Sequence, residues 1–318
     1  MDIRQLRYFV AIAEQGSFSR AAALLHIAQP ALSLHVRNME ADLGTSLLFR
    51  SPKGVVPTEA GEILLRNARV ILDQLAITEE EIRGHDNDPG GEVRLGLPGT
   101  ISQILAVPLI TAARMRYPRV KLRIAEAMSG FVLEWMRDAR IDLAVLYRDV
   151  TDSGIATVRI LEEELSFFGP DQPLADVDLP AEGTPVSYAS IAQTPLILPG
   201  EAHGLRELLE RQALASGIEL NTVIDVDSYS NIKELVSSRF GYSILPLNAI
   251  AREVAAGKLK SWPITRPTIQ RSIHLAHAVG RPMTNAVAAI EALAREVLRD
   301  LARTGRWVGA KILPVETE

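Results

Sequence analysis

The stretch from Phe18 to Asp42, FSRAAALLHIAQPALSLHVRNMEAD, predicts two short helices joined by a tight turn at residues 26–29. The second helix has apolar residues at steps of four, three and four, the period of one buried helical face: Leu32, Val36, Met39 and Leu43. Its opposite face is polar, which suits the major groove of DNA, where base edges present distinct hydrogen-bonding patterns. This stretch alone also fits the alternative of an ordinary helical hairpin with a solvated polar face.

The flanking residues extend the hairpin into a small domain. Residues 1–15 predict an amphipathic helix that could cover the apolar side of the hairpin, and Gly16 and Ser17 end one helix and cap the next. Two short β-prone runs, 47–50 and 54–57, enclose a turn. This pattern predicts a two-stranded wing that carries Arg50 and Lys53, cations suited to DNA phosphates or the minor groove.

The segment from Leu6 to Gly61 resembles the winged helix-turn-helix signature of the LysR-type transcriptional regulators almost position for position. The quoted helices, the run LLFRSPKGVVPTEAG and the helix before them carry the resemblance. We expect contacts with double-stranded promoter DNA from seven residues, of which Gln29 and Ser33 should read the bases: Ser19, Gln29, Pro30, Ser33, Arg37, Arg50 and Lys53. Ala28 departs from the family pattern, because many members have a capping Ser there, but packing should hold the helix without it. HIAQPALS and GVVPTEAG are also similar to the nitrogen-assimilation-control branch of the family.

The composition is that of an ordinary globular protein without thiol chemistry. The 318 residues include no cysteine, so disulfides and zinc–thiolate sites are excluded. There is no signal-peptide pattern and no apolar stretch of membrane-spanning length, so we expect a cytoplasmic protein with no membrane association. The net charge is −5, yet residues 1–58 hold six Lys and Arg against four Asp and Glu. Such a small basic excess implies that DNA binding needs more than one copy acting together.

Residues 58–84 predict a long helix without internal proline. Apolar residues at heptad spacing, typical of a helix that pairs with another copy, are expected to form a dimerisation seam: Leu64, Ala68, Ile71, Leu75 and Ile82. A helix packed on its own domain is the alternative. In the resembled family this helix makes an antiparallel dimer contact and pairs of dimers form tetramers, so a homodimer or homotetramer is expected. The polar, Gly- and Pro-rich run HDNDPGG (85–91) marks the clearest domain boundary and is read as a hinge, not a metal site.

Beyond Gly91, short β-rich runs alternate with helical stretches, which argues for α/β lobes with largely parallel sheets. The resemblance extends to a periplasmic-binding-protein-like effector domain, and it implies that the last strand and helix return to the first lobe. The expected fold class is therefore α+β multi-domain: an α-rich winged helix-turn-helix, a long linker helix and two α/β Rossmann-like lobes. The expected domains are the winged helix-turn-helix (1–58), the linker and dimerisation helix with its hinge (59–88), effector lobe I (89–162 and 267–303), effector lobe II (163–266) and a C-terminal tail (304–318).

Four predicted strand ends open into helices, and these turns are the expected effector site. Ligands of open α/β sheets bind beyond the carboxyl ends of the strands, and helix N-termini favour an anion such as a carboxylate. Six residues from the two lobes are expected to bind the effector: Thr100, Ser102, Ser129, His203, Arg206 and Asn231. Helix capping is the alternative role for each Ser and Thr, and Arg206 could instead lie on the outside of its helix.

Other polar clusters do not indicate catalysis. The sequence lacks G-x-S-x-G, H-E-x-x-H and G-x-G-x-x-G, so we expect no enzyme activity, no cofactor and no metal site. His274 and His277 lie three apart in a β-run and point to opposite faces of the strand. The run Glu162 to Glu164 is expected to be a solvated turn, and the residues from Gly305 onward a poorly specified tail.

The sequence thus predicts a LysR-type DNA-binding transcriptional regulator whose promoter binding is modulated by a small anionic effector, an organic acid for example. RNA polymerase is a further possible partner on the promoter. A cytoplasmic small-molecule receptor without a direct DNA role is the alternative. An enzyme working in the cleft between the lobes is a second alternative, but it would need a nucleophile–base pair or metal ligands that the sequence does not offer convincingly.

Overall fold

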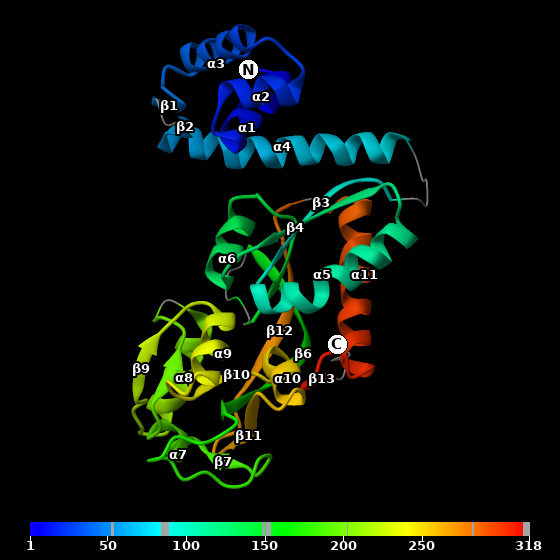
Figure 1. Cartoon of the computed structure of the whole chain (residues 1–318). Helices are drawn as coiled ribbons and strands as arrows, with labels where there is room; N and C mark the ends of the chain where they lie inside the picture. Colours follow the sequence, from blue (N-terminus) through cyan, green and yellow to red (C-terminus); the bar gives the residue numbers. More distant parts are fainter. Residues whose placement is uncertain are drawn as a thin grey trace.

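The computed structural model describes residues 1–51, 54–83, 89–147, 150, 154–201, 203–281 and 283–313, with the backbone alone for 80–83 and 129. Figure 1 shows a small helical N-terminal domain, a long helix that runs beneath it, and two α/β lobes on the other side of that helix. The predicted fold class is confirmed. No helix in the described ranges is long and apolar enough to cross a membrane.

The N-terminal domain is a three-helix unit with a β-hairpin wing. Its elements are α1 (Ile3–Gln15), α2 (Phe18–Leu25), α3 (Gln29–Leu43), β1 (Leu48–Ser51) and β2 (Gly54–Pro57). Ser17 caps α2, and His26 in the left-handed region (φ 55°) makes the tight turn toward α3. Leu32, Val36 and Met39 are completely buried as the helical period predicts, but Leu43 is exposed because the helix runs past the core there.

Helix α4 (Glu59–Arg83) connects the N-terminal domain to the lobes. Gly61 is required at its start, because a Cβ there would lie 2.0 Å from the Leu47 carbonyl oxygen. One turn further, Leu65 and Ala68 are buried in the core of the N-terminal domain. The following turns face lobe I, so α4 packs on both neighbours within one chain.

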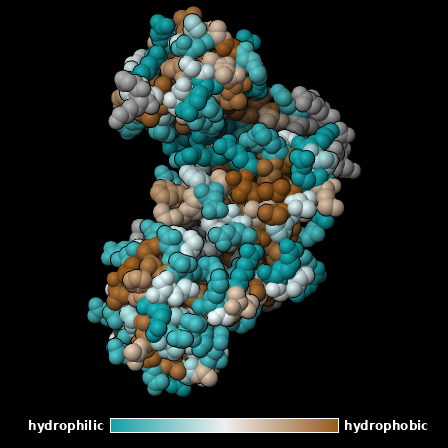
Figure 2. All heavy atoms as spheres, viewed as in Figure 1, coloured by the Kyte–Doolittle hydropathy of each residue, from teal (hydrophilic) through white to brown (hydrophobic). Residues whose placement is uncertain are grey.

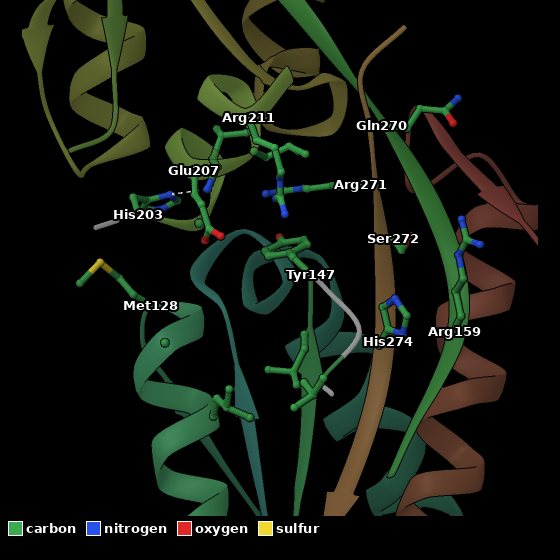
Figure 3. A pocket seen from close by; sticks show the side chains of 17 residues that line it. Met128, Tyr147, Arg159, His203, Glu207, Arg211, Gln270, Arg271, Ser272 and His274 are labelled. Atoms are coloured by element: carbon green, nitrogen blue, oxygen red, sulfur yellow. Dashed lines mark hydrogen bonds between the residues drawn. The ribbon is translucent and has the colours of Figure 1, made fainter. Parts of the chain in front are cut away.

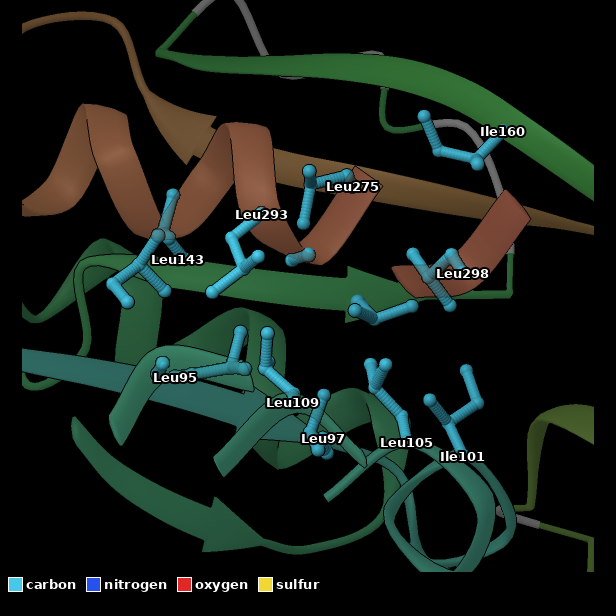
Figure 4. Close-up of a cluster of buried hydrophobic side chains, with 14 of the residues drawn as sticks. Leu95, Leu97, Ile101, Leu105, Leu109, Leu143, Ile160, Leu275, Leu293 and Leu298 are labelled. Carbon is cyan, nitrogen blue, oxygen red and sulfur yellow. The ribbon is translucent and has the colours of Figure 1, made fainter. Parts of the chain in front are cut away.

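Lobe I is a five-stranded sheet extended by a short C-terminal strand. Its elements are β3 (Gly91–Leu97), α5 (Gly99–Arg116), β4 (Val120–Glu126), α6 (Ser129–Arg137), β5 (Leu143–Leu146), the first part of β6 (Ile155–Pro170), β12 (Gln270–Ala278), α11 (Asn285–Arg303) and β13 (Ala310–Ile312). The strand order is β4-β3-β5-β12-β6. Leucine side chains from α5, α11 and the sheet fill the core between them (Figure 4).

Lobe II is built on the second part of β6. Its other elements are β7 (Val186–Ser187), α7 (Tyr188–Ala192), β8 (Leu196–Leu198), α8 (Gly204–Ala215), β9 (Thr222–Asp225), α9 (Tyr229–Ser237), β10 (Ser243–Pro246), α10 (Leu247–Ala255) and β11 (Leu259–Thr265). The expected parallel pairing holds for β3 with β4 and β5, and for β8 with β9. It is wrong for β6, whose partners β10, β11, β12 and β13 are all antiparallel, because this long strand passes through both lobes.

Two expectations about single segments are wrong. Glu162 to Glu164 do not form a solvated turn but lie inside β6, and Glu163 is only 2% exposed. The residues after 304 are not a loose tail as far as residue 313: Trp307 is buried in the lobe I core and β13 pairs with β6. Both errors have one cause, since the partners of these residues come from distant parts of the chain. The domain limits stated above stay predictions.

Candidate nucleic-acid interface and ligand cavity

Helix α3 presents a polar face to solvent at the outer side of the N-terminal domain. Gln29, Pro30 and Arg37 are exposed there, and Ser19 is exposed on α2. Ala28 is the N-cap of α3 and offers no side-chain hydrogen bond, as its residue type dictates. Pro30 has no backbone N–H, and the N–H groups of Ala31 and Leu32 donate to the Ala28 carbonyl oxygen, so side chains offer the hydrogen-bonding groups of this face.

Ser33 lies where the sequence pattern did not place it. It is only 8% exposed, and Gln29 Nε2 donates a hydrogen bond to its hydroxyl oxygen at 3.3 Å. This contact orients the Gln29 amide and leaves Ser33 with little exposed surface. Leu34, by contrast, is exposed on the same face between Pro30 and Arg37. The helical period of the sequence places Leu34 on the same face as Pro30 and Arg37. An apolar side chain there can contact a thymine methyl group.

The wing holds one of its two expected cations beside the helices. The Arg50 guanidinium lies 4.8 Å from the centre of the Phe18 ring, and its Nη2 is 3.5 Å from a carboxylate oxygen of Glu40. Glu40 also accepts a hydrogen bond from the Leu47 backbone N–H at 2.9 Å, which ties α3 to the wing. Arg50 is still accessible at the surface, whereas Lys53 lies outside the described residues.

The predicted seam of α4 is divided between two environments. Leu64 and Ala68 pack on the N-terminal domain of their own chain, which is the alternative that the heptad pattern left open. Ile71 is 40% exposed and Leu75 is half-buried, so these two are available to a partner, while the Ile82 side chain lies outside the described residues.

A charge cluster joins α4 to lobe I. Asp73 of α4 accepts hydrogen bonds from Arg281, which follows β12, and from Arg94 of β3. Asp142 neutralises the same two guanidinium groups, at 2.6 Å from Arg94 and 3.2 Å from Arg281. One turn earlier, Arg69 donates to the carbonyl oxygen of Asp138 at 2.9 Å. The helix that carries the N-terminal domain is thereby docked on lobe I.

A cavity of about 490 Å³ lies between the two lobes, beside the strands β6 and β12 that connect them. Figure 3 shows Met128 and Tyr147 from lobe I facing His203 and Glu207 from lobe II, with Arg271 reaching in from β12. The apolar part of the wall comes mainly from lobe I, and the polar part from α8 and the crossover strands. The principal polar lining residues are Arg159, His203, Glu207, Arg211, Gln270, Arg271, Ser272 and His274.

Arg271 is the buried cation of this cavity. It forms an ion pair with Glu163 on the neighbouring strand, and its guanidinium lies 3.5 Å from the centre of the Tyr147 ring. Burial by itself would lower the pKa of Arg271, but the attraction of the Glu163 carboxylate outweighs it, so the pKa lies above its usual value. Its Nη2 is buried and has no hydrogen-bond partner within the described part of the chain. A buried donor without an acceptor is costly, and a bound anion could supply one.

His203 closes the lobe II side of the cavity. Its Nδ1 accepts a hydrogen bond from the Leu205 backbone N–H at 3.1 Å and so caps α8, and its ring lies 5.6 Å from that of Tyr229. Burial lowers the pKa of His203, and the nearby Arg271 lowers it further, against the opposing effect of Asp227. The ring is therefore neutral at pH 7, with its proton on Nε2.

Of the expected effector-binding residues, only His203 is in the described lining of the cavity. Thr100 is near it and hydrogen-bonds the hydroxyl of Tyr147, and Ser102 is half-buried two residues further along α5. Arg206 points away from the cavity: it binds Asp225 at 2.7 Å and also pairs with Glu210 on its own helix. Asn231 is exposed on α9, and the side chain of Ser129 lies outside the described residues. The residues that the sequence did not reveal are Arg271 and its partners, because nothing local marks a buried arginine in a β-strand.

A winged helix-turn-helix, a docked linker helix and a two-lobed domain with a cavity define a ligand-responsive DNA-binding regulator. Residues 3–62 match the family model of the bacterial regulatory helix-turn-helix proteins of the lysR family, and residues 86–299 match the LysR substrate binding domain. The chain belongs to the LysR family of DNA-binding transcriptional regulators, as the sequence predicted.

Similar proteins agree along nearly the whole chain. Nitrogen assimilation regulatory protein nac of Escherichia coli (strain K12) is 31% identical over 278 residues, which are 86% of this chain and 88% of that protein. The DNA-binding transcriptional dual regulator OxyR of the same organism is 26% identical over 284 residues, or 89% and 91% of the two chains.

Solved structures support the fold. A variant of full-length OxyR from Pseudomonas aeruginosa superposes with a TM-score of 0.77 at 24% identity, over 94% of this chain and 98% of that one. Full-length CbnR in complex with its target DNA gives a TM-score of 0.53 at 23% identity, over 93% and 99% of the chains.

Proposed function

We propose that this LysR-family regulator controls transcription in response to a small organic anion bound in the cavity between its lobes. The observation that carries the proposal is the buried Arg271 at the cavity wall, with a guanidinium nitrogen that lacks an acceptor among the described residues. A carboxylate accepts two hydrogen bonds from arginine in a planar arrangement, which makes it the best-matched ligand group. Neutral His203 can donate a further bond from Nε2, and the lobe I wall accommodates an apolar portion.

On DNA, the exposed face of α3 is proposed to enter the major groove. Gln29, oriented by Ser33, reads a base edge, with Pro30 and Arg37 beside it. Ser19, Arg50 and Lys53 are proposed to contact the phosphate backbone and fix the register of the helix. The basic excess of this domain is small, which supports binding by at least two copies on neighbouring half-sites.

Two exposed apolar surfaces support a homodimer or homotetramer. One is on α4, where Ile63 and Ile71 face solvent. The other is on α5, where Val107, Ile110 and Met115 are exposed, and Figure 2 shows hydrophobic side chains gathered over the region of α5 and α11. Apolar patches of this kind mark contact surfaces in soluble proteins. Residues Leu75 and Ile82 of the heptad seam are proposed to continue the α4 contact.

The remaining parts of the proposal follow from the family. The protein is proposed to work in the cytoplasm, on promoters that RNA polymerase also occupies, and without catalytic activity of its own. The effector would act through its different affinity for two arrangements of the lobes, because a ligand that binds both equally shifts nothing. The charge cluster at Asp73 docks α4 on lobe I, so a change in the arrangement of the lobes can be passed through α4 to the DNA-binding domain.

A footprint on the DNA upstream of the protein's own gene tests the proposal. It is run at fixed salt with and without a panel of carboxylates, and the Arg271→Lys variant is run beside the wild type. The expected result is protection over several helical turns that shortens or shifts with one carboxylate, and a shift that Arg271→Lys weakens. Absence of protection even at low salt, where phosphate contacts are strongest, would instead favour a small-molecule receptor without a direct DNA role.

A further inference from the structure

Glu163 is a buried carboxylate that joins three distant parts of the chain. It lies in the middle of β6, opposite Arg271 on β12 and opposite Ala310 on β13. One of its oxygens pairs with Arg271 Nε, and the other accepts a hydrogen bond from Trp307 Nε1 at 2.9 Å. Both oxygens are therefore occupied, and each partner comes from more than a hundred residues away in sequence.

Trp307 reaches Glu163 because the chain reverses after α11. Helix α11 ends at Arg303, Gly305 adopts the left-handed conformation (φ 71°), and Trp307 then inserts into the lobe I core with 2% of its surface exposed. The chain continues into β13, where the Glu164 backbone N–H donates to the Gly309 carbonyl at 3.1 Å. The indole N–H is thus presented to the carboxylate from a turn that the pairing of β13 with β6 holds in place.

This arrangement controls the orientation of Arg271. An arginine side chain has several rotatable bonds, and ordering it only when a ligand binds would weaken binding. A carboxylate held at both oxygens has one orientation, and it holds the guanidinium against the face of Tyr147 at the cavity wall. Without the indole N–H, the second oxygen of Glu163 would be a buried acceptor without its donor, and the carboxylate would be free to turn toward other partners.

We infer that Trp307 is a positioning residue of the effector cavity: the C-terminal segment from Thr304 to Leu313 orients Arg271 through Glu163. The segment is then part of the ligand site although it does not line the cavity. The inference rests on the proposed role of Arg271 as the anion-binding group, but the orientation of Arg271 can be measured without any ligand.

The test is Trp307→Phe, which keeps an aromatic ring in the core but removes the N–H donor together with part of the ring volume. Trp262→Phe is the matched control for the lost ring volume, because Trp262 is also buried and donates a hydrogen bond, to the Pro180 carbonyl at 3.0 Å, but lies in the lobe II core. The full-length variants are treated with phenylglyoxal, which modifies accessible guanidinium groups, and modification of each arginine is followed by mass spectrometry. Exposed Arg7 on α1, which is not part of the described cavity lining, serves as the internal reference.

In Trp307→Phe, Arg271 should react about tenfold faster relative to Arg7, since the lost bond to a charged group corresponds to roughly one power of ten in an equilibrium. In Trp262→Phe the ratio should equal that of the wild type. If Trp307→Phe lowers the unfolding midpoint as the control does but leaves the reactivity of Arg271 unchanged, Trp307 is only a packing residue and the inference is overturned. Glu163→Gln is a second variant; it keeps an acceptor for Trp307 but removes the charge, and it should also raise the reactivity of Arg271.

The same assay separates this inference from the proposed function. Acetate, benzoate and succinate are added to the wild type as probes, and protection of Arg271 from phenylglyoxal indicates that an anion reaches it. If a probe protects Arg271 in the wild type and protects it less in Trp307→Phe, the result supports both the anion-binding role of Arg271 and the positioning role of Trp307. Faster modification in Trp307→Phe without protection by any probe in the wild type would contradict the anion-binding role alone.

Discussion

Removing the charge of Asp73 should loosen the linker helix from lobe I. Asp73→Asn keeps the size of the side chain and one acceptor, but it replaces the carboxylate that Arg281 and Arg94 share with an amide. Both arginines keep Asp142, and Arg281 also keeps its bond to the Ile141 carbonyl at 2.9 Å, so the cluster is weakened without leaving a bare buried charge.

The size of the effect follows from these contacts. A hydrogen bond to a charged group contributes about 1.5–3 kcal/mol and a neutral one about 1 kcal/mol, so the docking of α4 should lose about 1–2 kcal/mol. That loss lowers the ratio of docked to undocked helix by roughly 5- to 30-fold. The side chain of Asp73 is 28% exposed, so solvent and salt screen part of the attraction and the lower end of this range is expected.

Hydrogen exchange measured by mass spectrometry reads this equilibrium directly. Backbone amides of α4 after Asp73 should exchange faster in Asp73→Asn, whereas amides near Ala68, which pack on the N-terminal domain, should not change. Glu296→Gln is the control, because it weakens an ion pair with Arg116 at the surface of lobe I, where both side chains are at least half exposed. Equal exchange of the α4 amides in Asp73→Asn and wild type would refute the view that this cluster docks the linker.

Three further predictions concern the N-terminal domain and the cavity between the lobes. Gln29→Ala should weaken binding to the operator by about 1–3 kcal/mol and relax the sequence preference at one base pair. Binding to a set of singly substituted operators measures both effects. Weakening by the same factor for every operator would contradict base reading by Gln29. Ala28→Ser should stabilise the N-terminal domain by roughly 1 kcal/mol by adding the missing cap of α3, read from the thermal midpoint, and no rise would mean that the first turn is held by packing alone. Because burial keeps the pKa of His203 below its usual value of about 6.5, the unfolded chain takes up this proton first as the pH falls, and stability should decrease from about pH 6.5 downward. His203→Asn retains the cap of α8 and should flatten this decrease in urea unfolding at pH 7.5 and 5.5; an unchanged slope would assign the acid sensitivity to other groups.

The N-terminal domain was largely predictable because its determinants are local. The helical period of Leu32, Val36 and Met39, the cap at Ser17 and the turn signals around the wing all act within a few residues of chain. The same holds for the existence of α4, which needs only helix-forming residues and the absence of proline. The contacts of α4 were less predictable. A heptad pattern indicates which residues form one face of the helix, but not whether that face packs on its own domain or on another copy of the chain.

The cavity between the lobes was much less predictable from the sequence. The sequence indicated a two-lobed domain and singled out His203, which lines the cavity, but it did not single out Arg271 and interpreted Glu163 and Trp307 as parts of a solvated turn and a tail. Arg206 was a reasonable choice from its place in the first turns of α8, but its side chain pairs with Asp225 instead. In each case the deciding partner lies many residues away, so no window of sequence contains both members of the pair.

By itself, the sequence determined the family, the winged helix-turn-helix, the long linker helix and the alternation of strands and helices in the lobes. These features depend on short-range periodicity and on capping and turn residues. Only the tertiary structure decided which charged side chains are buried and what they do there. A buried charge is tolerated only when folding brings an opposite charge and hydrogen-bond donors to it. That condition is met here by β6, β12 and the segment after α11, which meet at Glu163 only in the folded chain.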